Sequence, residues 1–360
     1  MVNNQIEKRT IIYIPGHAQW GGAHLYIDQL CIYLNANGVS AQIVSADTSG
    51  FACNSRKITL VASRMKRFFH SFYLAYIFRK EGIDSIVLND LSSLWLAPVF
   101  RLFGFKVISL LHLYMKRRSE NPMGHSAAEY WILKLSSFFC SAIFSVNREN
   151  VEVFGRERVQ FISNFVPEWF VAKSTDAEAE KSYDFLLVSR LSREKNIPLF
   201  LKLLRELGRR GREYSVLIVG EGEEREEIER LVDEYGLRKS VVLKGWKKRE
   251  ELPAIYDSAR CFVISSLHEG FATTLLEAHA RGLPAIVTST SGFCVDFVLG
   301  YGGRSGLVFE EKDIYDSNFL YNVENLLKRS SDYRSLCIEK ARAFSQEKVL
   351  GPILKSIEAL

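Results

Sequence analysis

Short apolar runs rich in Val and Ile alternate with longer stretches of helical periodicity along the whole chain. The runs are apolar on both faces, as strands are when helices cover both sides of a parallel sheet. Six lie in the first half, at residues 10–15, 41–45, 85–88, 106–111, 142–146 and 159–162. Five follow in the second half, at residues 183–189, 215–219, 240–243, 261–265 and 284–288. This alternation predicts an α/β fold with parallel sheets.

A stretch of small and polar residues at 167–182 interrupts the alternation and predicts a linker. At about 150 residues per domain, the 360 residues of the chain suggest two domains. We therefore expect two Rossmann-like domains in tandem, at residues 1–171 and 172–345, and a helical segment at 346–360. No internal repeat or low-complexity tract suggests another architecture.

Composition excludes several classes of protein. Apolar residues make up 47% and charged residues 25% of the chain, which excludes disordered, collagen-like and coiled-coil proteins. The most apolar long stretch, residues 91–114, is interrupted by Arg101 and Lys106, so we expect no membrane-spanning helix. The N-terminus lacks the pattern of a signal peptide, and we expect a cytoplasmic protein.

The six cysteines are scattered singly, without a C-x-x-C pair, which argues against a zinc ribbon or a thioredoxin-type site. Their positions are Cys31, Cys53, Cys140, Cys261, Cys294 and Cys337. We expect reduced, buried thiols with a structural role, as in most cytosolic proteins.

The net charge of +5 is too small to argue for nucleic-acid binding. The positive excess lies in residues 1–172, which carry a net charge of +6, whereas the remainder carries −1. Residues 56–80 interleave Lys and Arg with Phe and Tyr, a pattern that suits an anionic membrane surface. An ordinary helix that buries its aromatic rings and exposes its cations has the same pattern, so both interpretations stand.

The strongest chemical signal is a segment with two glutamates eight residues apart, S-L-H-E-G-F-A-T-T-L-L-E-A at 266–278. Glu269 follows an expected strand, at the edge where open α/β sheets bind ligands. A helix is expected to begin near residue 271, and its free N–H groups favour a phosphate. Glu277 lies two turns further along on about the same face. The two carboxylates are suitable acceptors for hydroxyl groups on either side of a phosphate.

Cations and glycines follow the first two expected strands of the second half. Arg190 and Lys195 lie in S-R-L-S-R-E-K-N at 189–196, directly after the expected strand at 183–189. Arginine offers a planar fork to phosphate oxygens and lysine a mobile point charge. Gly220 and Gly222 follow the strand at 215–219, where they allow a tight turn or a close approach of backbone to a ligand.

Together these segments resemble the donor half of the retaining GT-B glycosyltransferases of glycosyltransferase family 4. The shared pattern is a strand and R-L-x-x-x-K, a strand and G-x-G, and then E-G-F-x-x-x-L-L-E-A. In the first half, Gly21 and Gly22 are similar to the family's glycine-rich loop and His112 to its N-domain histidine. The resemblance covers nearly the whole chain. It implies a GT-B fold, with parallel sheets that face across a cleft and a C-terminal helix that returns to the N-domain.

The resemblance also implies an activity: transfer of a sugar, with retention of configuration, from a nucleoside diphosphate to a saccharide or lipid-linked saccharide. UDP-hexose or UDP-N-acetylhexosamine is the expected donor, and surface polysaccharide or lipopolysaccharide assembly the expected process. The enzyme would be cytoplasmic, with a peripheral location at the inner face of the cell membrane. No metal or bound cofactor is expected, since the family is metal-independent and no D-x-D pair is placed as a metal clamp.

The resemblance assigns roles to individual residues. Arg190 and Lys195 would hold the diphosphate, Glu269 the donor sugar and Glu277 the ribose. His112 would lie near the transferred sugar, as a catalytic candidate with Arg190, Lys195 and Glu269. Further donor contacts are implied for Gly21, Gly22, Gly220, Gly245, Trp246, Gly270, Phe271, Ala272 and Thr274.

Three departures from the family pattern concern the sugar and the acceptor. His24 stands where the family often has Glu, 163–165 reads S-N-F in place of P-N-G, and Ala272 replaces Gly or Pro. Acceptor-side candidates are His17, His24, His125 and His268. Two other functions stay open: a GT-B nucleotide-sugar epimerase, which needs no acceptor, and an inactive nucleotide-sugar-binding or membrane scaffold.

Overall fold

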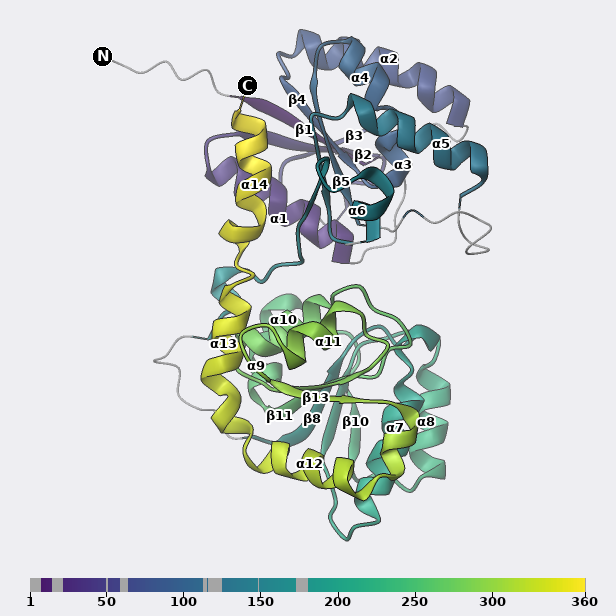
Figure 1. Ribbon diagram of the computed structural model, residues 1–360, viewed down its shortest axis with the longest axis vertical. Coiled ribbons are helices and arrows are strands. Elements are labelled where there is room, and N and C mark those ends of the chain that lie inside the picture. The colour runs from purple at the N-terminus through teal and green to yellow at the C-terminus, as the bar shows by residue number, and fades with distance from the viewer. Residues whose placement is uncertain are drawn as a thin grey trace, which may run out of the picture. The chain divides into compact units, whose positions relative to one another are not determined.

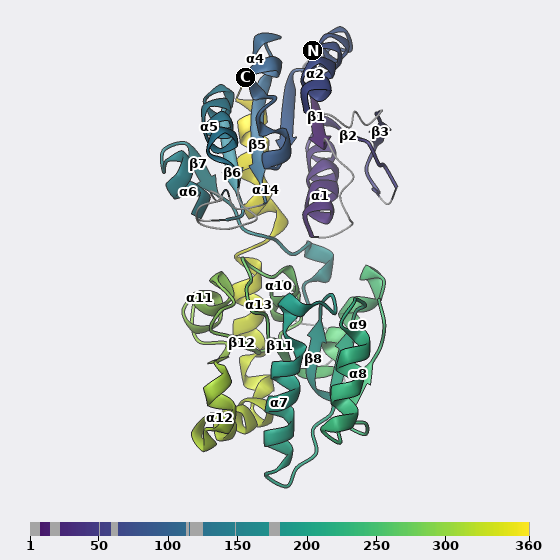
Figure 2. The ribbon, with the colours of Figure 1, turned by 90° about the vertical axis from the view of Figure 1, so that its right-hand side faces the viewer.

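The computed structural model describes residues 8–14, 22–49, 51–58, 64–112, 115, 125–147, 149–172 and 181–359. The chain divides into two compact units, Met1–Ser163 with Glu347–Leu360 and Asn164–Gln346. Each unit is an α/β structure around one parallel sheet (Figures 1 and 2).

The sheet of the first unit has the strand order β3-β2-β1-β4-β5-β6-β7, and every neighbouring pair is parallel. Its strands are β1 (Arg9–Ile14), β2 (Ser40–Ser45), β3 (Ser55–Lys57), β4 (Ser85–Asn89), β5 (Lys106–Leu111), β6 (Ala142–Ser145) and β7 (Val159–Phe161). Its helices are α1 (Gly22–Ala36), α2 (Arg64–Lys80), α3 (Leu91–Leu94), α4 (Ala97–Leu102), α5 (Ala127–Ser136), the 3₁₀ helix η1 (Ser137–Phe139) and α6 (Glu149–Phe154).

The C-terminal helix α14 (Gln346–Glu358) joins this first unit. Its Gly351 lies against the Tyr33 side chain of α1. Near its end, Lys106 donates to the carbonyl of Ala359 at 3.1 Å, and Lys8 donates to the carbonyl of Glu358. The helix thus runs beside α1 and ends near the amino ends of β1 and β5 (Figure 1).

The sheet of the second unit has the strand order β10-β9-β8-β11-β12-β13 and is also parallel throughout. Its strands are β8 (Tyr183–Val188), β9 (Val216–Val219), β10 (Val241–Leu243), β11 (Ala259–Ile264), β12 (Ala285–Thr288) and β13 (Gly306–Phe309). Its α-helices are α7 (Ile197–Gly208), α8 (Arg225–Glu234), α9 (Leu252–Asp257), α10 (Thr273–Ala280), α11 (Phe293–Leu299), α12 (Ser317–Lys328) and α13 (Arg334–Arg342).

Helices cover both faces of the second sheet. The side chains of Phe185 and Leu187 pack toward α7 and α8, whereas the intervening Leu186 packs toward α9 and α10. This alternation explains why the central residues of these strands are apolar on both sides, because neither face of a covered sheet meets water.

All eleven apolar runs form strands, so the expected α/β architecture of two parallel-sheet units is confirmed. Two further strands were not expected. β3 is short and polar and lies at a sheet edge, so it lacks the pattern of a buried strand, whereas β13 is a buried apolar run of four residues that follows a glycine-rich turn. Helix α8 occupies the charged stretch near residues 223–235.

The segment expected as a linker begins as part of the second unit. Val166 forms a parallel bridge with Ser345, and Phe170 and Ala172 are buried. The contacts therefore divide the chain after Ser163, because Val166 and Phe170 belong to the core of the second unit. The rest of the expected linker includes residues 173–180, which lie outside the described residues.

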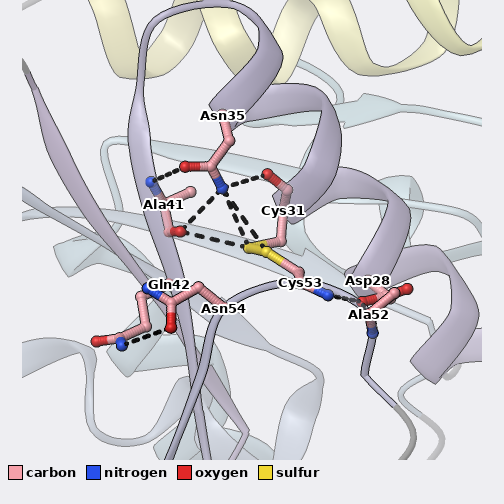
Figure 3. Close-up of a disulfide and its surroundings, with 8 residues drawn as sticks. All are labelled: Asp28, Cys31, Asn35, Ala41, Gln42, Ala52, Cys53 and Asn54. Atoms are coloured by element: carbon pink, nitrogen blue, oxygen red, sulfur yellow. Dashed lines mark hydrogen bonds between the residues drawn. A yellow bond between two sulfur atoms is a disulfide. The ribbon is translucent and has the colours of Figure 1, made fainter.

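The expectation of reduced cysteines is wrong for one pair. Cys31 of α1 and Cys53, which precedes β3, form a disulfide with a Cα–Cα distance of 6.2 Å (Figure 3). Beside it, Asp28 accepts hydrogen bonds from the backbone N–H groups of Ala52 and Cys53, both at 2.9 Å. The two cysteines are 22 residues apart, and the packing of α1 against β2 brings them together. Cys140, Cys261, Cys294 and Cys337 are free thiols.

Candidate functional site

The strand order of the second sheet marks where a ligand site is expected. Successive strands proceed outward from β8 on one side and from β11 on the other, so the order reverses between these neighbours. Open α/β sheets bind ligands at the carboxyl ends of strands that flank such a switch point. Arg190 and Lys195 follow β8, and Glu269 follows β11.

Lys195 and Glu269 meet across this switch point. The ammonium group of Lys195 donates to Oε1 of Glu269, and the Ser266 hydroxyl donates to the same oxygen at 3.1 Å. The two charged side chains are 21% and 16% exposed, which leaves each accessible to a ligand while it is held by the protein. A cation and a carboxylate at one point suit a ligand that carries both phosphate and hydroxyl groups.

Hydrogen bonds between the two loops hold this pair in place. The backbone N–H of Leu267 donates to the carbonyl of Glu194 at 2.8 Å. The hydroxyl of Ser265 donates to the carbonyl of Lys195 at 2.7 Å. Asn196, the N-cap residue of α7, adopts a left-handed conformation with a φ of 46°. The site is therefore built from backbone contacts as well as from the two charged side chains.

Arg190 lies in the same loop as Lys195, but its guanidinium group pairs with Glu194 at 2.5 Å. Its side chain is 65% exposed, so this ion pair contributes little stability. The side chain of Arg190 can therefore exchange Glu194 for a ligand phosphate at small cost.

Three glycines permit close packing of the loops at this edge. A Cβ on Gly220, whose φ is 141°, would lie 1.8 Å from the carbonyl oxygen of Ser189. A Cβ on Gly222 would lie 2.2 Å from the carbonyl oxygen of Leu191, and one on Gly292 would lie 2.2 Å from that of Glu269. The G-x-G segment thus packs against the Arg190 loop, and Gly292, which the sequence motifs did not include, packs against the Glu269 loop.

At the start of α10, some of the groups proposed to contact a donor already contact other parts of the protein. The Phe271 ring is buried among Phe293, Phe297 and Phe344, so its side chain belongs to the core. The N–H of Ala272 donates to the Cys294 sulfur at 3.3 Å. Gly270 is exposed and Thr274 is half-buried near the same helix start.

Glu277 is buried, with only 4% of its surface exposed, and it accepts a hydrogen bond from the Tyr256 hydroxyl at 2.8 Å. Burial raises the pKa of the Glu277 carboxyl above its ordinary value, while the Tyr256 hydrogen bond and the charge of Arg249 act in the opposite direction. The motif pointed to Glu277, but no sequence signal marked Tyr256, because α9 carries no recognisable pattern around it.

The loop after β10 presents Trp246, which is 69% exposed. Before it, Gly245 has a φ of 34° and accepts a hydrogen bond from the N–H of Gly220 at 2.9 Å. The loops after β8, β9 and β10 are therefore linked in series, from Arg190 through Gly220 to Trp246.

The first sheet has its own switch point, between β1 and β4. Asn89 ends β4, and Asp90 follows with a φ of 68° and accepts a hydrogen bond from the N–H of Leu91. A positive φ at a residue other than glycine stores backbone strain and is concentrated at functional sites. The sequence motifs did not include Asn89 or Asp90.

His112 follows the neighbouring strand β5. Among the residues that the structure describes, its Nε2 atom and the Oδ1 atom of Asn89 are buried and have no hydrogen-bond partner. Burial lowers the pKa of His112 to about 4, with the charge of His24 acting in the same direction and that of Asp90 against it. The imidazole is therefore neutral at pH 7. Buried polar atoms without a partner are rare in folded proteins, so this edge is a candidate for binding.

Of the remaining candidates in the first unit, His24 is close enough to His112 for its charge to affect the His112 pKa. Gly21 and His17 lie outside the described residues, and Gly22 is the first residue of α1. His24 lies 6.1 Å from the Phe51 ring, between centroids. His125 is partly buried, and His268 in the second unit is exposed.

The described residues contain neither a metal-binding cluster nor a membrane-spanning helix. No group of three or more His, Cys, Asp or Glu side chains within them is arranged to hold a metal ion. Among the helices in the described ranges, none combines the length and apolar character needed to cross a membrane.

A solved structure of Anabaena Alr3699/HepE in complex with UDP superposes on this chain with a TM-score of 0.75. It covers 98% of this chain and 100% of that one, at 14% sequence identity. The fold is that of a GT-B glycosyltransferase. Residues 172–344, which contain Arg190, Lys195, Glu269 and Glu277, also match the family model for glycosyl transferases group 1.

Curated relatives of this GT-B protein are glycosyltransferases. The amylovoran biosynthesis glycosyltransferase AmsD of Erwinia amylovora is 28% identical over 313 residues, which are 80% of this chain and 86% of AmsD. An alpha-1,4-N-acetyl-D-galactosaminyltransferase of Campylobacter jejuni, named for a PP-undecaprenol-linked saccharide, is 27% identical over 224 residues, or 61% of this chain and 58% of that protein. For three other relatives, the chain spans 44%, 38% and 28% of the relative's length.

Proposed function

We propose that the protein is a retaining glycosyltransferase that uses a nucleoside-diphosphate sugar, with UDP-hexose or UDP-N-acetylhexosamine as the donor. Its acceptor is a saccharide or a lipid-linked saccharide in the assembly of surface polysaccharide or lipopolysaccharide. The enzyme acts in the cytoplasm, at the inner face of the membrane. Similarity to AmsD and to the Campylobacter transferase supports the acceptor class, and the likeness to the UDP complex of HepE supports the donor.

The observation that carries this proposal is the contact between Lys195 and Glu269 at the switch point of the second sheet. A donor brings a diphosphate and a sugar to one place, and it needs a cation for the first and hydroxyl acceptors for the second. On donor binding, Lys195 turns from Glu269 to the diphosphate, and Glu269 accepts the sugar hydroxyls. Arg190 leaves its exposed partner Glu194 and adds a second cation.

In the transfer step, the bond between the anomeric carbon and the β-phosphate oxygen breaks while a bond to the acceptor oxygen forms on the same face of the sugar. The acceptor proton passes to the departing phosphate. Negative charge grows on the diphosphate, and Lys195, Arg190 and the start of α10 stabilise it. No metal ion takes part in this proposal, since the protein's own cations supply the positive charge.

The ribose is assigned to Glu277. Its carboxyl is oriented by Tyr256, so that one oxygen is occupied by the protein and the other is available to a hydroxyl group. The base is assigned to the loop that contains Gly245 and the exposed ring of Trp246, which offers a stacking surface. On the acceptor side, Asp90 and His112 at the edge of the first sheet contribute hydrogen-bonding groups.

Thermal unfolding with UDP, GDP, ADP and CMP, each alone and as its sugar conjugate, tests the donor. We expect UDP and UDP-sugars to raise the midpoint most. A ligand at about 100 times its Kd adds roughly 2.7 kcal/mol of stability, which corresponds to several degrees for units of this size. A response to CMP alone would overturn the donor assignment.

Transfer is then tested by incubating the full chain with UDP-sugar in the presence and absence of a membrane extract containing lipid-linked saccharides. Acceptor-dependent release of UDP is expected. Conversion of the UDP-sugar without acceptor would instead identify an epimerase. A scaffold would bind UDP but turn over no UDP-sugar with any acceptor. Its UDP binding would also be unaltered in the Glu269→Ala variant.

A further inference from the structure

The disulfide of the first unit joins a buried cysteine to an accessible one. Cys31 is fully buried, and its sulfur lies 3.5 Å from the carbonyl oxygen of Ala41 in β2. Cys53 is half-buried, and its neighbours Ala52 and Asn54 are exposed. A thiolate in solution can therefore reach the disulfide at the Cys53 sulfur, whereas the protein shields the Cys31 sulfur.

Hydrogen bonds hold the Cys53 segment in place independently of the crosslink. The carboxylate of Asp28 in α1 accepts from the backbone N–H groups of Ala52 and Cys53, both at 2.9 Å (Figure 3). On the β2 side, the N–H of Ile43 donates to the carbonyl of Asn54 at 3.0 Å. The two cysteines therefore stay within reach of each other when the bond is open, as re-formation of a disulfide requires.

The surroundings of the sulfurs also suit the open form. The side-chain amide of Asn35 forms three hydrogen bonds with the backbone of Cys31 and Ala41, at 2.8, 2.9 and 3.1 Å. Its nitrogen lies 3.6 Å from the Cys31 sulfur and 3.7 Å from the Cys53 sulfur (Figure 3). A polar N–H group beside a sulfur favours the thiolate that leaves when a disulfide is attacked. Once protonated, the Cys31 thiol has an acceptor in the carbonyl of Ala41.

The location that we propose for the protein determines what such a pair does. Disulfides in the cytoplasm are usually transient, because thiols of the glutathione and thioredoxin classes reduce them. The other four cysteines of the chain are free thiols, as is usual in a reducing compartment. The inference thus rests on the proposed function for its compartment and on the contacts of Cys31 and Cys53 for its chemistry.

We propose that Cys31 and Cys53 form a reversible redox modification site that exchanges with a low-molecular-weight thiol such as glutathione. A thiolate attacks the Cys53 sulfur, the bond between the two protein sulfurs breaks, and Cys31 leaves as a thiolate that takes up a proton. A second thiolate then attacks the reductant's sulfur in the mixed disulfide and releases Cys53, which is also protonated. Two electrons pass to the protein, and the two reductant thiols become a disulfide. The reverse exchange re-forms the crosslink.

The crosslink lies beside the carboxyl edge of the first sheet. The segment before Cys53 includes Phe51, whose ring centre lies 6.1 Å from that of His24 near the start of α1. His24 is in turn close enough for its charge to act on His112. β3, which follows Cys53, is a three-residue strand at the sheet edge, so its pairing with β2 adds little to hold the segment. Opening the crosslink therefore lets the segment fluctuate more widely and weakens acceptor binding at this edge.

Redox titration of the full chain tests the chemistry. The protein is equilibrated in glutathione buffers that span the reducing range of the cytosol, its thiols are alkylated, and each cysteine is quantified by peptide mass spectrometry. We expect Cys31 and Cys53 to pass together from crosslinked to alkylated within this range. A pair that stays crosslinked in every buffer is a structural disulfide, and a pair that is alkylated in every buffer forms no crosslink. Either result overturns the proposal.

Two single variants test which sulfur is attacked. Cys31→Ser leaves Cys53 without its partner, so oxidised glutathione should form a stable mixed disulfide at Cys53. The matched variant Cys53→Ser leaves only the buried Cys31, which should not react. The opposite pattern would overturn the assignment of Cys53 as the entry point.

Steady-state transfer assays measure the consequence for the acceptor. Reduction of the wild type should raise the acceptor KM by about fivefold or more and leave UDP affinity unchanged. The double variant with serine at both positions should not respond to glutathione. Cys140→Ser, which loses a free thiol of the same unit, should respond as the wild type does. Equal acceptor KM values in the two states overturn the effect on the acceptor. Absence of transfer in both states defeats the proposed function, and the titration still decides the modification.

Discussion

The carboxyl edges of the two sheets differ in how their polar groups are satisfied. In the second unit, the charged groups are paired: Lys195 with Glu269, and Tyr256 with Glu277. In the first unit, Asn89 and His112 each bury an atom that has no hydrogen-bond partner among the described residues, and Asp90 has a strained backbone. At the edge of the second unit a neutral group, the Ser192 hydroxyl, is also buried without such a partner, so the contrast concerns the charged and ionisable groups. Both edges lie at a switch point of the same kind of sheet, so the difference comes from the loops.

This difference indicates two ways to prepare a site. An edge with internal pairs keeps its charged groups oriented, and a ligand must displace one partner of each pair. An edge with buried, unpaired atoms has already lost its contact with water, so a ligand that supplies the missing partner gains the full value of the hydrogen bond. The recognisable motifs lie at the paired edge. The following four predictions test this comparison, from the largest expected effect to the smallest.

The largest effect is expected at the paired edge. Lys195→Met removes the cation that meets the diphosphate, and Glu269→Gln removes its carboxylate partner with little change in shape. Each should lower the rate of sugar transfer by about 100-fold or more, as losses of charge stabilisation in transition states do. Steady-state kinetics of the purified variants measure this. As a control, Lys202→Met breaks the surface pair with Glu311 and should leave the rate within about twofold. A Lys195→Met enzyme with normal kinetics would show that the pair is only structural.

The second effect concerns the stability of the first unit alone. Replacing Cys31 and Cys53 by Ser opens a crosslink that spans 22 residues and should cost the unit about 3 kcal/mol. Calorimetry should show the transition of the first unit at lower temperature and that of the second unchanged. Reductant should lower the transition temperature of the first unit in the wild type and should leave that of the double variant unchanged. An unchanged wild-type transition in reductant would mean that the crosslink does not stabilise this unit.

The third effect concerns the buried hydrogen bond between Tyr256 and Glu277 in the second unit. Tyr256→Phe leaves the Glu277 carboxyl buried without its donor, which should cost about 1–3 kcal/mol of stability. Loss of the hydrogen bond also raises the pKa of Glu277 further, because the Tyr256 hydroxyl acts to lower it. UDP affinity should therefore fall about tenfold and should recover as the pH is raised, because a higher pH ionises the carboxyl. Calorimetric titration at several pH values measures this.

Tyr214→Phe is the control for this variant, since Tyr214 is also buried but its hydroxyl reaches Glu324 at 3.5 Å, outside the candidate site. It should leave UDP affinity and its pH dependence as in the wild type. If both variants weaken UDP binding equally, the Tyr256 contact has no specific part in donor recognition.

The smallest effect on stability is expected at the unpaired edge. Asp90→Asn keeps an oxygen for the N–H of Leu91, and asparagine tolerates a positive φ, so the free energy of unfolding should change by less than about 1 kcal/mol. The KM for the acceptor should rise, while UDP affinity stays constant. A loss of UDP affinity with an unchanged acceptor KM would place this residue on the donor side and break the comparison.

Several features were accessible from the sequence because they depend on neighbours along the chain. Short apolar runs identified eleven of the thirteen strands in the described residues, and the spacing of Glu269 and Glu277 identified the loop and helix that carry them. Of the two strands that were not expected, β3 is short and polar, and β13 is an apolar run of four residues after a glycine-rich turn. The sequence pattern showed the aromatic residues of α2, but it did not show which of them are buried. In the structure Phe78 lies in the core and Phe69 is exposed.

Other features depend on residues that are far apart in the chain. The order of strands across the second sheet places β8 beside β11, and only this order brings Lys195 to Glu269. The packing of α1 on β2 pairs Cys31 with Cys53, and the packing of α9 beside α10 places Tyr256 at Glu277. Local periodicity and helix-start signals are properties of a short segment, so the sequence by itself determined them. Contacts between loops form only when the whole sheet and its helices have folded, because strands that are distant in the sequence must first lie side by side. For that reason only the tertiary structure decided which side chains meet.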